Sequence, residues 1–191
     1  MALWPTESAF AEVRFSKTAT LIGTPAFAQA TGTVVINGTV APKCTAIDPI
    51  NGTISLGELA RTDGTVDKTF SAAPNGLSRM FTVRCNGSNP QLSVEARSLV
   101  NAAATNSPNG YTNTVDYTAK LSAKSATGST TAVSDLSLNG GATTGLIGGR
   151  LAAEANNVTL TISDGITSNS TAILEAGTYT GSVDIIIAPA A

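Results

Sequence analysis

The chain has 191 residues, of which 42% are hydrophobic and only 13% are charged, and its formal net charge is −2. A disordered chain would carry more charge and fewer apolar residues, so this composition excludes one. Basic clusters are absent from the sequence, which leaves no electrostatic footprint for nucleic acid. No apolar run reaches about 18 residues, so the sequence predicts no membrane-spanning helix.

The first 28 residues are expected to comprise a secretion leader and its upstream residues. Arg14 and Lys17 precede a short, mostly uncharged stretch that ends in Ala-Phe-Ala, a small-x-small pattern that signal peptidase accepts. Cleavage is expected after Ala28 or Ala30; the alternative is that these residues form an irregular folded arm. About 160 residues then remain, which is enough for one domain but not for a second core.

Residues 31–44, "TGTVVINGTVAPKC", come next and end in a cysteine. Apolar and polar residues alternate here, which predicts a strand over residues 33–41. Cys44 and Cys85 are the only cysteines. In a chain with a leader such a pair favours a disulfide, which would close a loop of about 40 residues. Two free buried thiols remain an alternative, whereas zinc needs three or four Cys or His ligands and the chain has no His.

Runs with the alternation and residue types of strands recur along the rest of the chain, separated by turn residues. Gly, Pro, Asn, Asp and Ser gather between them, as expected at turns. The predicted strands cover residues 33–41, 52–59, 79–85, 91–96, 115–123, 156–163 and 177–189. About seven short strands of this kind predict an all-β chain that folds as a β-sandwich.

The clearest alternation lies in the strands that should line the core. Phe81, Val83 and Cys85 share one face, and the last strand is the most apolar on one face. The residues on that face of the last strand are Tyr179, Gly181, Val183, Ile185 and Ile187. Two segments give weaker signals: residues 149–155 predict one helical turn or a bent strand, and the glycine-rich residues 139–150 predict a flexible connection.

Candidate catalytic groups are few. Without His the usual Ser-His-Asp triad is impossible, and paired cysteines leave no thiol nucleophile. Ser122 with Lys124, or Ser16 with Lys17, could form a Ser-Lys dyad, but a solvated surface accounts for both pairs. Acidic residues such as Asp63 and Asp67 lie in turn sequences, where Asp hydrogen-bonds to its own backbone. We therefore predict that the chain is not an enzyme and holds no metal or cofactor.

Four segments together resemble the subunits of chaperone-usher pili, in particular the archaic branch built from spore coat protein U-like domains. The matching sequences are "TGTVVINGTVAPKC", "ISLGEL", "FTVRCNG" and "EAGTYTGSVDIIIAP", within residues 29–189. The sequence departs from the family at Leu56, where an aromatic residue is common, and at the terminal residues 188–191. The resemblance implies an immunoglobulin-like β-sandwich that lacks one strand and exposes a hydrophobic groove.

The resemblance also implies how the groove would be filled. Residues 29–41 would be a donor segment that completes the sheet of a neighbouring copy, and residues 42–191 would form the domain. Val34, Ile36 and Val40 would insert on one face, with Gly38 where a large residue would not fit. The groove would be flanked by the last strand, through Tyr179, Val183, Ile185 and Ile187.

Partners and location follow from the same resemblance. A periplasmic chaperone would hold the subunit, an outer-membrane usher would assemble it, and other copies would form a surface fimbria that supports adhesion or biofilm formation. Export would pass through the periplasm to the cell surface. The alternative is a self-complete secreted β-sandwich that binds a surface ligand, with residues 33–41 as the first strand of its own sheet.

Overall fold

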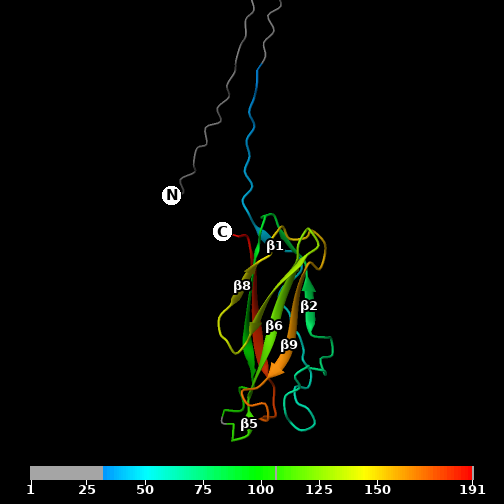
Figure 1. Cartoon of the computed structure of the whole chain (residues 1–191), viewed down its shortest axis with the longest axis vertical. Helices are drawn as coiled ribbons and strands as arrows, with labels where there is room; N and C mark the ends of the chain where they lie inside the picture. The colour runs from blue at the N-terminus through cyan, green and yellow to red at the C-terminus, as the bar shows by residue number, and fades with distance from the viewer. Residues whose placement is uncertain (1–31, 106, 191) are drawn as a thin grey trace, which may run out of the picture. The chain divides into compact units, whose positions relative to one another are not determined.

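The computed structural model describes residues 32–105 and 107–190 (Figure 1). Strands, turns and irregular segments account for all of these residues, so the predicted all-β class is confirmed. Across the described residues, no helix has the length and hydropathy that a membrane crossing requires. The predicted leader, residues 1–28, lies outside the described residues.

The described residues form eleven strands, of which the longest are β4, β6, β9 and β11. The strands are β1 (Cys44–Ala46), β2 (Ser78–Phe81), β3 (Val83–Cys85), β4 (Gln91–Val100), β5 (Tyr111–Thr112), β6 (Thr114–Lys124), β7 (Thr130–Leu136), β8 (Thr143–Leu146), β9 (Val158–Ile166), β10 (Ile173–Leu174) and β11 (Thr180–Ala188).

Seven of the described strands belong to one curled sheet. The order is β11-β4-β6-β9-β2, with β7 also paired to β6 and β8 also paired to β4. The β4–β6 ladder consists of two residue pairs, Leu99 with Val115 and Val100 with Thr114. The sheet therefore curls at this short ladder, and its two halves face each other as in a β-sandwich.

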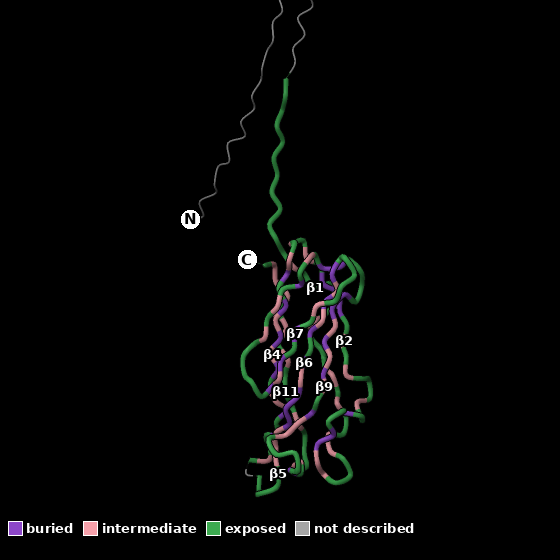
Figure 2. The backbone as a smooth tube through the Cα atoms, viewed as in Figure 1, coloured by how far each residue is buried: buried purple, intermediate pink, exposed green. Residues whose placement is uncertain are grey.

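The core lies between the two halves and consists mainly of aliphatic side chains. Alternate residues of β4 and β6 point inward; Leu92, Val94 and Leu121 have no exposed surface. Phe70 and Phe81 are each 1% exposed and are the largest of the fully buried side chains. Figure 2 shows the buried residues, in purple, following these strands through the middle of the domain.

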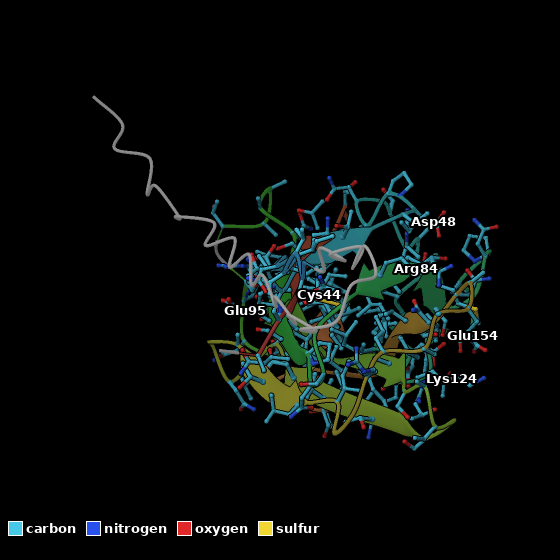
Figure 3. The ribbon with its side chains drawn as sticks, turned by 90° about the horizontal axis from the view of Figure 1, so that it is seen from above. Cys44, Asp48, Arg84, Glu95, Lys124 and Glu154 are labelled. Carbon is cyan, nitrogen blue, oxygen red and sulfur yellow. A yellow bond between two sulfur atoms is a disulfide. The ribbon has the colours of Figure 1, made fainter. Side chains whose placement is uncertain are left out.

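The predicted disulfide between Cys44 and Cys85 is present, with a Cα–Cα distance of 4.1 Å (Figure 3). It joins β1 to β3, in which Cys44 lies directly opposite Cys85. The predicted inward face of residues 81–85 is also confirmed, because Phe81 and Val83 are buried. The bond is the covalent anchor of β1, a strand of three residues in which two are exposed.

Two predictions of local structure are wrong, and for a third the structure decides between the two alternatives. Residues 52–59 form no strand because their backbone has no partner strand in the described chain. Part of the predicted flexible connection, residues 143–146, is β8, which pairs with β4. Residues 149–155 contain no helical turn, and Leu151 instead forms an isolated bridge with Ser125.

The acidic residues of the loop before β2 hydrogen-bond to their own turns, as predicted. Asp63 accepts the Thr65 backbone amide at 3.0 Å. Asp67 accepts the hydroxyl and amide groups of both Thr69 and Ser71, with the two amides at 3.0 and 2.7 Å. The Ser71 hydroxyl, followed by these amides, holds the pKa of Asp67 well below its usual range. The carboxylate thus organises the loop that carries the buried Phe70.

Candidate functional site

A groove runs along the domain between β11 and residues 50–60. It consists of two adjoining cavities of about 630 and 690 Å³. Residues of both walls line both cavities: Thr53, Ile54 and Leu56 on one side, and Gly181 on the other, so the cavities form one continuous feature.

The first wall is β11, which is an edge strand in the described sheet because it pairs only with β4. Ile185 lies opposite Val94, and Ile187 lies opposite Leu92. The two β4 residues are completely buried, whereas their β11 partners are only partly buried. Residues opposite each other share a face of the sheet, so this difference shows that cover is missing beyond β11. An edge with unpaired backbone groups is a template for another strand.

The second wall is the segment 50–60, which packs against the core without forming a strand. Ile54 and Leu56 are half-buried, and Ser55 between them is exposed. This alternation is that of a strand and explains why the sequence predicted one. Among the described residues, none makes a hydrogen bond to the backbone of residues 52–57. The segment therefore has the side-chain pattern of a strand without its backbone pairing.

The floor of the groove is apolar and comes from both halves of the sheet. Its side chains are Phe81 of β2, Leu99 of β4, Tyr117 of β6, and Leu160 and Ile162 of β9. All five are largely buried, yet they line a cavity. A surface of this kind, formed by the core of the domain, is suited to apolar side chains.

The phenol of Tyr117 is the main polar group beneath the β11 wall. Its hydroxyl donates to the Ser182 backbone oxygen at 3.0 Å, next to the register shift in the β11–β4 ladder. Burial raises the pKa of Tyr117 to about 12, although a hydrogen bond with the Arg97 backbone opposes the shift. The phenol is therefore neutral at ordinary pH and ties β11 to the sheet where the ladder is irregular.

Each end of the groove is held by a polar side chain. Arg79 donates to the backbone oxygens of Pro49 and Asn51. At the other end, the Tyr179 hydroxyl lies 3.1 Å from the Thr112 oxygen and 3.0 Å from the Glu175 oxygen. Burial, then the charge of Glu175, raises the pKa of Tyr179. Both side chains act on the backbone of the groove walls.

Of the predicted groove residues, Val183 and Ile185 line one cavity and Tyr179 lines the other. Ile187 is partly buried against the core in the same strand. Sequence reasoning did not single out Arg79 and Tyr117, because no local pattern marks an arginine on the inner side of an edge strand or a phenol beneath a register shift.

The predicted donor residues lie in a segment without secondary structure. Val34, Ile36 and Val40 are 74%, 91% and 83% exposed, and residues 32–41 belong to no strand. Gly38 has no atom within 4 Å of an added Cβ. Their role as a donor strand stays a prediction.

The candidate dyad of Ser122 and Lys124 lies on β6, where the Lys124 ammonium group is 2.6 Å from Glu154 (Figure 3). The second candidate, Ser16 with Lys17, lies outside the described residues. No group of three or more potential metal-binding side chains occurs within the described part of the chain. These contacts assign Lys124 to an ion pair at the surface.

Comparisons with known proteins leave the groove as the main guide to function. The chain matches no protein-family model, no curated protein and no solved structure.

Proposed function

We propose that this chain is a structural subunit of an extracellular fibre, in which residues 33–41 of one copy occupy the groove of the next. One observation carries the proposal: β11 offers a free edge beside an apolar groove, while the chain also has an exposed alternating apolar segment. In the proposed complex the segment adds a strand to β11, and main-chain hydrogen bonds provide affinity while alternate side chains set the register.

The composition of the segment fits this groove. Residues 33–41 contain no charged residue, and the floor of the groove is built from aliphatic and aromatic side chains. In an extended segment Val34, Ile36 and Val40 point to one side, and Gly38 leaves a gap between them. Burying each of the three apolar side chains stabilises the complex by about 2 kcal/mol.

Addition of this kind joins two different surfaces of the subunit, the segment and the groove. Such a heterologous contact does not close on itself and produces an open chain of copies. We propose that a periplasmic chaperone covers the groove before assembly and that an outer-membrane usher joins the subunits into a surface fimbria for adhesion or biofilm formation. The disulfide is compatible with an oxidising compartment on this route.

A pair of neighbouring substitutions tests the proposal. Ile36→Asn places a polar amide on the side of the segment that would enter the groove, whereas Val35→Asn places the same group on the opposite side. Loss of apolar burial and an unpaired amide together weaken the Ile36→Asn contact by about 3 kcal/mol, or about 100-fold. Both residues are exposed in the described chain, so neither change should alter the stability of the monomer.

The measurement is sedimentation velocity of the purified full-length chain over a range of concentrations. The unmodified chain and Val35→Asn should form a ladder of oligomers, which an excess of a peptide of residues 31–41 should suppress. Ile36→Asn, and a chain that lacks residues 31–40, should remain monomeric. A monomer at every concentration that also fails to bind the peptide would refute the proposal and favour the self-complete binding module.

A further inference from the structure

Six Asn-Gly pairs occur in the described part of the chain, and each could undergo deamidation. Their asparagines are Asn37, Asn51, Asn75, Asn86, Asn109 and Asn139. In this reaction the backbone nitrogen of the following residue attacks the asparagine carboxamide, and glycine favours the attack because it has no Cβ to obstruct it. All six asparagines are exposed, so solvent access does not distinguish them. Their hydrogen bonds do.

Two of the pairs have a reacting group that is already engaged in a hydrogen bond. The Gly76 amide, which is the nucleophile of its pair, donates to the Ala73 oxygen at 3.4 Å. The Asn86 carboxamide, which is the group attacked in its pair, accepts the Lys43 amide through Oδ1 at 2.7 Å. Each group must be released before the reaction can begin, so we expect both pairs to react slowly.

Three further pairs have a backbone that is held by hydrogen bonds. The Asn51 oxygen accepts a hydrogen bond from Arg79 at 2.8 Å. Residues 108–111 form a turn that is closed by a 3.0 Å hydrogen bond between its last and first residues. The Asn139 amide donates to the Leu136 oxygen at 2.9 Å. These bonds oppose the backbone rotation that brings the glycine nitrogen to the carboxamide.

Asn37 and Gly38 lack restraints of this kind within the described chain. Both residues are exposed and belong to no strand, and neither makes a hydrogen bond among the described residues. No described atom lies within 4 Å of a Cβ added to Gly38, so nothing packs beside the nucleophile there. The Gly38 nitrogen can therefore reach the Asn37 carboxamide without a prior local opening.

We propose that Asn37 is a site of spontaneous deamidation and that its isoaspartyl product does not fit the groove of the next copy. The Gly38 amide loses its proton to solvent, its nitrogen bonds to the Asn37 Cγ, and the side-chain nitrogen leaves as ammonia. Water then opens the five-membered succinimide. Opening at the side-chain carbonyl gives aspartate, whereas opening at the backbone carbonyl gives isoaspartate, whose main chain contains one extra carbon. Water is the only co-reactant, and nothing is oxidised or reduced.

The extra carbon would interrupt the alternation on which the donor segment depends. In the unmodified segment Val34, Ile36 and Val40 point to one side when it is extended. One added backbone atom after Ile36 moves Val40 out of phase with the other two, as a slip in register does. Asn37 itself points to the opposite side, so aspartate there keeps the phase and directs its charge away from the groove floor. This inference rests on the proposed function and adds how an unassembled copy loses its donor segment with time.

Peptide mapping by mass spectrometry tests the site on the full-length chain, incubated at mildly alkaline pH. Asn37 should deamidate at least about fivefold faster than the asparagine of any other pair, because reaction at the others waits for a local opening. Enzymatic methylation of isoaspartyl groups should label the same peptide. Asn37→Gln keeps the carboxamide but does not form a five-membered ring, so it should remove both signals. A rate at Asn37 no faster than at the other pairs would overturn the site and leave the proposed function intact.

Three forms of a peptide of residues 31–41 test the consequence, through their ability to suppress oligomers of the full-length chain. The unmodified peptide and Asn37→Asp should act equally, whereas the isoaspartyl form should need an about 30-fold higher concentration, because one apolar side chain is lost from the groove side. Equal potency of all three forms, or equal weakening of Asn37→Asp and the isoaspartyl form, would overturn the effect on register. A chain without oligomers that does not bind the unmodified peptide would overturn the proposed function and this consequence together, while the mapping would still decide the site.

Discussion

Loss of the disulfide is the perturbation with the most direct structural consequence. Cys44 belongs to β1, whose other two residues, Thr45 and Ala46, are exposed. Ladder pairs between β1 and β3 involve three residues on each strand. Because so little apolar surface holds β1 in place, the covalent bond is the main constraint on the start of the domain.

The size of the effect follows from the 41 residues of sequence that separate the two cysteines. In the chain-entropy account, opening a loop of this length returns about 13 cal/mol/K to the unfolded chain, or about 4 kcal/mol at 25 °C. For a chain of this size, each kcal/mol corresponds to about 2–4 °C in Tm, so reduction should lower Tm by about 8–16 °C.

Thermal and urea unfolding of the full-length chain, oxidised and fully reduced, measure this loss directly, with mass spectrometry to verify the state of the thiols. Cys44→Ala/Cys85→Ala serves as the second comparison. Both cysteines are partly buried against the core, so the double variant should lose slightly more stability than the reduced chain. A loss below about 1 kcal/mol on complete reduction would show that β1 is held by other contacts and would refute this reasoning.

Three further predictions concern ionisation and backbone geometry. Burial raises the pKa of Tyr117 to about 12 in the folded chain, above about 10 when unfolded, so its contribution to stability is fully present below pH 10 and is lost between about pH 10 and 12. Urea unfolding of Tyr117→Phe should show a smaller alkaline loss of stability than the unmodified chain, and equal losses would contradict the assignment. Hydrogen bonds from Ser71 and then Thr69 lower the pKa of Asp67, so its contribution to stability is present above about pH 4 and is lost as the pH falls below 4. Asp67→Asn should therefore reduce the difference between the free energies of unfolding at pH 7 and at pH 3. An unchanged difference would count against this role of Asp67. Gly57→Ala places a Cβ 2.2 Å from the Ala72 oxygen at a φ of +71°, so it should lower the free energy of unfolding in urea by about 1–3 kcal/mol. Gly76 has a similar φ of +75° but open space around it, so Gly76→Ala should lower this free energy by about 1 kcal/mol. Similar losses in the two variants would show that the contact with Ala72 relaxes.

The β11 wall of the candidate site could be predicted from the sequence, because its apolar residues alternate with polar ones along the strand. The alternation in residues 183–187 predicted which side chains of β11 would face inward, and the structure places Val183 and Ile185 at the groove. The positions of Arg79 and Tyr117 could not be predicted in this way. Their roles depend on backbone atoms that lie far away in sequence, at Pro49 and Asn51 for Arg79 and at Ser182 for Tyr117.

By itself, the sequence determined the all-β class, the disulfide and the buried faces of the long strands. These properties arise from the alternation of side chains along a strand and from the small number of cysteines, both of which are local or compositional. The tertiary structure decided whether an alternating segment becomes a strand, since hydrogen-bonded pairing needs a partner edge. Residues 158–163 have one in β6 and form part of β9, whereas residues 52–57, with an equally regular pattern, face the open groove and remain unpaired.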